Sequence, residues 1–230
     1  MFRNLVLAAA AAGLAAGLLT AALQHVTTTP IILAAEAYEV STPATHTDAA
    51  GEAALHNHGP ADAWSPADGM ERTLYASLAT VVTGIGFALA LVGAMVLSNR
   101  RIDGWTGLAF GAAGFAAVAL APSLGLPPEM PGNATADLSD RQQWWAFAVA
   151  ATAGGLAAVL LAGNAGLRLA GLALMTLPHI VGAPRPAEYA SAAPAELAAQ
   201  FAAASLVVSA VFWAILGTTA GAVHARLSGS

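Results

Sequence analysis

The side chains of this chain that could do chemistry are histidines and carboxylates placed near the ends of apolar stretches. In "TTPIILAAEAYE", Pro30 is suited to start a helix, which would put Glu36 and Glu39, three residues apart, on one helix face. Two carboxylates on one face can hold a cation or simply face water, and the residues alone favour water.

A second candidate is the histidine in "LMTLPHIVGAP", near the end of an apolar run. Pro178 has no N–H to donate to the carbonyl of Leu174, so that oxygen is expected to be free beside the imidazole of His179. Irregular backbone that lines a cavity can bind ions, although a simple kink with an interfacial histidine fits equally well. Gly182 and Pro184 are expected to end this helix.

The third candidate, Glu129, lies in the stiff segment "GLPPEMPG". This segment belongs to the loop between the third and fourth apolar stretches, which contains Pro122, Pro127, Pro128 and Pro131. Because of these prolines, the loop is predicted to follow an extended path without helix. A carboxylate held by a stiff backbone loses less freedom on binding than a mobile one. Trp144 and Trp145 follow, and this pair is expected to mark the membrane interface.

Three further histidines, His46, His56 and His58, fall in the segment 40–66. This segment mixes Ala, Thr, Pro, His and Asp without periodicity and is predicted to be a flexible outward loop. A His-x-His pair in a loop is a weak metal signal, and chance explains it at least as well.

The composition predicts that a membrane surrounds these groups. Hydrophobic residues make up 57% of the 230 and charged ones 9%, against about 25% charged in soluble domains. The mean hydropathy is +0.67. There is no cysteine, which excludes disulfides and thiolate chemistry, and a net charge of −5 argues against nucleic acid as a partner.

The apolar stretches predict an all-α polytopic membrane protein with one domain, 1–230. A spanning helix needs about 20 apolar residues. Five stretches meet or approach this length, namely 5–23, 74–97, 105–121, 145–162 and 201–223. A sixth, 167–181, is short and contains a proline, so the bundle is expected to have five to six transmembrane helices. Close helix packing is expected at three G-x-x-x-G pairs, namely Gly13/Gly17, Gly107/Gly111 and Gly217/Gly221.

Arginine positions favour six spans with a cytoplasmic N-terminus. Under this topology five of the eight arginines lie inside, whereas twelve of the thirteen acidic residues lie outside. His25, after the first span, would then lie outside at a depth similar to that of His179. The first apolar stretch is expected to remain in the mature protein as a span and not to be cleaved as a signal peptide, because it is longer than a signal-peptide core and lacks a sharp cleavage site.

The chain resembles the CbtA family of predicted cobalt transporter subunits. The matching stretches cover nearly the whole chain, namely "TTPIILAAEAYE", "WSPADGMERTLYASLATVVTGIGFAL", "APSLGLPPEMPG", "RQQWW", "LPHIVGAP" and "PAELAAQF…FW". The resemblance implies cobalt uptake across the bacterial inner membrane, usually with five spans. It also implies a small partner, CbtB, with one span and a histidine-bearing tail.

Cobalt uptake would suit the outward groups, since Co²⁺ accepts imidazole nitrogen and carboxylate oxygen. The predicted metal ligands are His25, Glu36, Glu39, Glu71, Glu129 and His179. No permanently bound cofactor is expected, and Ni²⁺ or Zn²⁺ would suit the same ligands. The chain has no phosphate loop and no HExxH or Ser/His/Asp motif, so it is not expected to be an enzyme. The alternative is a membrane scaffold that captures metal for a partner without transporting it.

Overall fold

The fold is a bundle of long helices. The computed structural model describes residues 2–41, 64, 66–67, 69–188, 191 and 193–229. Their helices are α1 Phe2–Val26, α2 Thr28–Ser41, α3 Met70–Leu97, α4 Gly104–Phe115, the π-helical turn η1 Ala116–Leu120, α5 Ala121–Ser123, α6 Leu138–Leu161, α7 Ala165–Val181 and α8 Ala195–Ser228. The predicted loop 40–66, with His46, His56 and His58, falls almost wholly outside the described residues.

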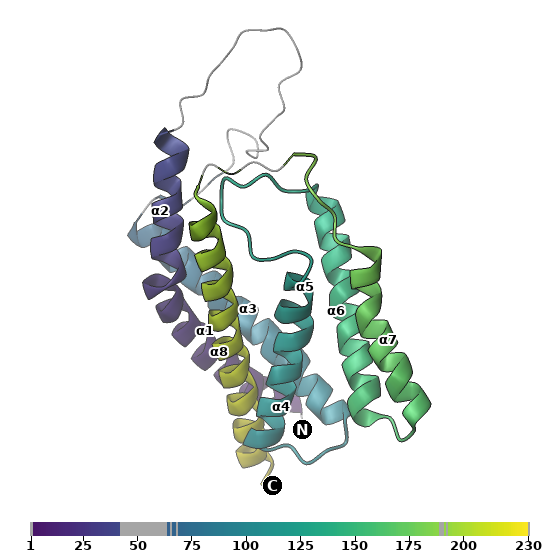
Figure 1. The fold of residues 1–230 in the computed structure, drawn as a ribbon. Helices are drawn as coiled ribbons and strands as arrows, with labels where there is room; N and C mark the ends of the chain where they lie inside the picture. The colour runs from purple at the N-terminus through teal and green to yellow at the C-terminus, as the bar shows by residue number, and fades with distance from the viewer. Residues whose placement is uncertain are drawn as a thin grey trace.

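Five of the described helical segments are long and apolar enough to cross a membrane: α1, α3, α4 continued through η1 and α5, α6, and α8. The shorter α7 has 17 residues, which at about 1.5 Å each gives about 26 Å. It runs back beside α6 from one end of the bundle to the other (Figure 1). The predicted bundle of five to six helices, one short and containing a proline, is confirmed.

Helix was predicted to end at Gly182 and to be excluded at Pro122. Helix α7 ends at Val181, where Gly182 has a φ of 84°, as its predicted role as a terminator requires. Pro122, in contrast, was wrongly predicted to exclude helix. It lies within α5, the short helix that continues α4 and η1 in one span.

Helix α8 is the centre of the main body and packs against α1 and α4 along much of its length. The predicted close approach at the glycine pairs is confirmed. Gly107 and Gly111 of α4 lie directly against Gly217 and Gly221 of α8, backbone to backbone. Gly13 and Gly17 of α1 likewise lie against α3. A larger core cluster surrounds these contacts and includes Val92, Met95, Phe212, Trp213 and Leu216.

Helices α6 and α7 form a hairpin beside this main body (Figure 1). They approach each other at Gly155 and Gly171, and α6 meets the main body through α4, η1 and α5. Near the α6–α7 connection, Nη2 of Arg100, which follows α3, donates a hydrogen bond to the carbonyl of Leu160 at 3.2 Å. The hairpin is therefore attached to the body chiefly through α6.

The two ends of the bundle differ in charge. Residues 2 and 229, the α3–α4 connection and the α6–α7 connection lie at one end (Figure 1). We call it the arginine-rich end, because its described charges are Arg3, Arg100, Arg101, Arg168, Arg226 and Asp103. The opposite end is the acid-rich end, with Glu36, Glu71, Glu129, Asp137, Asp140, Glu188 and Glu196 against Arg72, Arg141 and Arg185.

Candidate functional site

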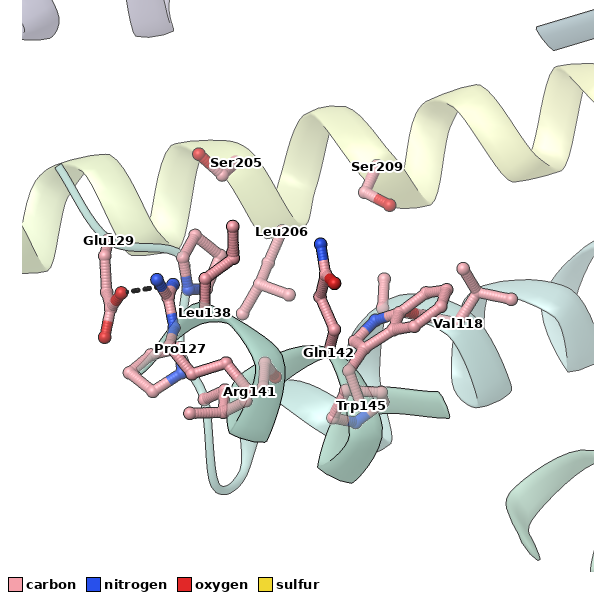
Figure 2. A pocket seen from close by; sticks show the side chains of 15 residues that line it. Val118, Pro127, Glu129, Leu138, Arg141, Gln142, Trp145, Ser205, Leu206 and Ser209 are labelled. Carbon is pink, nitrogen blue, oxygen red and sulfur yellow. Dashed lines mark hydrogen bonds and ion pairs between the residues drawn. The ribbon is translucent and has the colours of Figure 1, made fainter. Parts of the chain in front are cut away.

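A cavity of about 410 Å³ opens at the acid-rich end. Its walls come from η1 and α5, the proline-rich loop after α5, the first two turns of α6, and α8 (Figure 2). It therefore lies where the α6–α7 hairpin meets the main body.

The π-helical turn shapes one wall of this cavity. Ala121 donates its N–H to the carbonyl of Ala116, five residues earlier, which widens the helix at this point. Pro122 has no N–H for the carbonyl of Val118. The indole Nε1 of Trp145 donates to that oxygen instead, at 3.3 Å. This hydrogen bond joins α6 to η1 at the cavity wall.

Glu129 reaches the cavity from the proline-rich loop and forms an ion pair with Arg141 in the first turn of α6 (Figure 2). About a quarter of each side chain is exposed, 24% for Glu129 and 28% for Arg141. The neighbouring Met130 is only 3% exposed and packs against α2 and α8, which fixes the loop beside Glu129. Among the described residues, this pair supplies the only charges that line the cavity.

Neutral oxygen donors line the rest of the polar wall. Ser205 and Ser209 lie one turn apart on α8, and the amide of Gln142 extends from α6 into the space between the two helices (Figure 2). Ser123 also lines the cavity, and its hydroxyl donates to the carbonyl of Leu120. Together with Glu129 these residues provide one carboxylate, one amide and three hydroxyl groups. Hard and borderline divalent cations, including first-row transition metals, accept such oxygen donors.

Asp137 caps α6 just outside the cavity. Its Oδ1 accepts hydrogen bonds from the hydroxyl of Ser139 at 2.7 Å and from the backbone N–H of Ser139 at 2.8 Å. These bonds stabilise the charged form and lower the pKa of Asp137. At the other end, the Thr106 N–H lowers the pKa of Asp103 in the same way. Both caps therefore remain anionic well below neutral pH.

Glu36 lies on α2 and pairs with Arg72 of α3, at 2.7 Å between Oε1 and Nη2. This ion pair ties α2 to the start of α3. Glu71, next to Arg72, is exposed at the side of a shallow groove along α3. Glu39 belongs to α2, but its side chain lies outside the described part of the structure.

The two membrane-edge histidines are far apart in the architecture. His25 is exposed at the end of α1, and His179 is exposed near the end of α7, a helix that has no contact with α1. The ring of His179 meets Trp144 edge-on, with centroids 6.1 Å apart. Trp144 was expected to mark the membrane interface, and its depth in the membrane stays a prediction. It is 6% exposed, and its indole donates to the carbonyl of Pro178 at 3.3 Å.

The predicted ligands do not converge as a set. Within the described residues, no three His, Asp or Glu side chains lie close enough to hold one metal ion. Glu129 lines the cavity, Glu36 and Glu71 lie on the α2–α3 side, and His179 lies on the hairpin. Their role as ligands stays a prediction. Four further residues that line the cavity were not predicted, namely Arg141, Gln142, Ser205 and Ser209. The available signals were "RQQWW" and the four-residue spacing of the two serines.

The family to which the chain belongs is shown by its sequence match and not by the geometry of the cavity. A family model described as "Probable cobalt transporter subunit (CbtA)" matches residues 2–225. No curated protein and no solved structure matches the chain. The matched region contains four of the described spans entirely, all but the last three residues of α8, and every residue of the cavity. The chain therefore belongs to the CbtA family of probable cobalt transporter subunits.

Proposed function

We propose that this multi-pass membrane subunit captures Co²⁺ at its acid-rich end during uptake, and that Glu129 is the first ligand inside the protein. The observation that carries the proposal is the cavity at the junction of hairpin and body, with a carboxylate fixed at its mouth. Its volume of about 410 Å³ is ample for an ion that keeps several waters, since a water occupies about 30 Å³ in the liquid.

The cavity would exchange part of the hydration shell for protein oxygens. The carboxylate of Glu129 attracts the ion, and the amide of Gln142 and the hydroxyls of Ser205 and Ser209 replace waters as it moves inward. None of these groups binds so strongly that the ion would be trapped, which transport requires. The same oxygen set suits other divalent metals.

The acid-rich end as a whole concentrates the cation. Its described charges are seven carboxylates against three arginines, and their summed field raises the local concentration of divalent cations. The exposed imidazoles of His25 and His179 add nitrogen ligands at the same end. The acid-rich end faces outward in this proposal, because the arginine-rich end is expected to face the cytoplasm. The membrane is then the bacterial plasma membrane.

A partner would complete the pathway. The middle parts of the described spans carry no charged side chain and no histidine, so they offer no chain of strong ligands between the two ends. A small single-span subunit with a histidine-bearing tail, of the CbtB type, would supply such ligands. The same observation favours the second candidate function, a scaffold that captures metal for a partner but conducts nothing itself.

Radioactive cobalt uptake separates the two functions. Cells that lack their own cobalt importers would express this chain alone, the partner alone, or both together. A transporter subunit predicts saturable uptake that requires this chain and increases with the partner. Uptake by the partner alone, at the rate seen with both chains, would leave only the scaffold role. No uptake in any cell would exclude transport by this pair.

A further inference from the structure

We propose that Arg141 is a built-in counter-cation, which occupies Glu129 when no metal is present and turns to Asp137 when the ion binds. The inference rests on the proposed function and names the regulation of that same site. Its starting point is the charge balance of the cavity. Glu129 and Arg141 cancel, so an arriving divalent cation meets a neutral wall as long as the ion pair is closed.

A closed ion pair opposes the binding of a metal to the same carboxylate. If Glu129 held Co²⁺ within coordination distance, the guanidinium of Arg141 would lie a few ångströms from a doubly charged ion. Like charges at such distances repel strongly even at the effective dielectric constant near a protein surface, about 20. We therefore expect Arg141 to leave when Glu129 takes the metal.

The hold of Arg141 on Glu129 is incomplete. The ion pair uses Nη2 of Arg141 and Oε2 of Glu129, whereas a strong arginine–carboxylate pair uses two parallel hydrogen bonds. Within the described residues, Nε of Arg141 is buried and has no hydrogen-bond partner. The guanidinium thus retains unused donor capacity in the closed state, which lowers the cost of leaving.

Asp137 offers an acceptor for the displaced guanidinium. It precedes Arg141 by four residues at the N-cap of α6, and the backbone N–H of Arg141 donates to the Asp137 carbonyl at 3.1 Å, so the two residues are joined across the first turn of the helix. The distance between them is short enough for the long side chain of Arg141 to reach back toward the cap. Both Ser139 bonds engage Oδ1 of Asp137, and the N–H of Asp140 adds a further contact to this carboxylate.

The test is a cycle of variants of the full chain in lipid nanodiscs, titrated with CoCl₂ by calorimetry. R141Q should bind Co²⁺ roughly tenfold more tightly, because the competing cation is gone. R141K, which keeps the charge, should bind like the unaltered chain. D137N should bind more weakly, and this loss should vanish in D137N/R141Q. Asparagine caps a helix as well as aspartate, so D137N changes charge and leaves the cap.

The controls separate this inference from the proposed function. E129Q that binds Co²⁺ as tightly as the unaltered chain would overturn both. Loss of binding in E129Q, with R141Q equal to or weaker than the unaltered chain, would overturn the counter-cation alone. Should R141Q fail to fold, as thermal unfolding would reveal, D137N decides: unchanged affinity in D137N overturns the exchange, and weaker affinity supports it.

Discussion

Gly217 of α8 lies so close to the backbone of Gly107 in α4 that a methyl group cannot enter without moving one helix. Gly217→Ala would place its Cβ against the carbonyl oxygen of Gly107 and near the Cα of Gly111. These are backbone atoms, which cannot rotate away as a side chain can. Overpacking of this kind costs about 1–3 kcal/mol.

Helix propensity partly offsets this cost. Alanine is favoured over glycine within a helix by about 0.8–1.0 kcal/mol in peptides, and this gain is available at any helical glycine. Gly86→Ala is the matched control, because nothing lies within 4 Å of the Cβ it would add to α3. We expect Gly217→Ala to lower the free energy of unfolding by about 0–2 kcal/mol and Gly86→Ala to leave it unchanged or raise it by up to about 1 kcal/mol, so that Gly217→Ala is the less stable variant.

The assay is reversible unfolding of both variants in mixed micelles, followed by tryptophan fluorescence, since Trp213 is buried beside the α4–α8 contact. The ranking of the two variants is the informative quantity, because detergent changes both absolute values together. Equal stability of the two variants, or a more stable Gly217→Ala, would refute the close α4–α8 approach.

Three other substitutions test separate parts of the structure. His179→Ala is expected to reduce cobalt accumulation in cells more than His58→Ala does; equal or reversed effects would make the 40–66 segment the important one. Trp144→Phe keeps the ring beside His179 but removes the hydrogen bond to Pro178, at a cost of about 1 kcal/mol, and hydrogen exchange should increase near the end of α7; unchanged exchange would count against that bond. Asp137 has a lowered pKa in the folded state, so its stabilisation is present above its ordinary value of 3.8 and is lost as the pH falls below it. Asp137→Asn should therefore remove part of the acid sensitivity below pH 4, and identical acid titrations of both proteins would argue against the cap.

The parts of the fold that could be predicted from sequence are those that depend on local composition. Apolar length located the spans, and the glycine spacing located closely packed faces of α1, α4 and α8, because both properties are carried by consecutive or nearby residues. The spacing did not show which helix each face meets. The end of α7 followed from Gly182 for the same reason.

What sequence reasoning missed depends on partners far apart in the chain. Trp144 is buried because α7 folds back over it, and Pro122 stays helical because Trp145 satisfies the carbonyl that this proline cannot serve. Glu129 was predicted as a ligand from its stiff loop, but its pairing with Arg141 depends on how the loop meets α6. None of these three contacts leaves a periodic pattern in the sequence.

The central claim is that Glu129 captures cobalt within the cavity, and the initial rate of cobalt uptake tests it most directly. Cells would express Glu129→Gln or the matched Glu196→Gln, whose carboxylate is exposed at the same end but lies outside the cavity. At cobalt concentrations below saturation, with equal amounts of protein in the membrane, Glu129→Gln should reduce the rate about tenfold or more, the equivalent of about 1.4 kcal/mol of binding. Glu196→Gln should stay close to the unaltered chain. Equal rates for the two variants would contradict the claim.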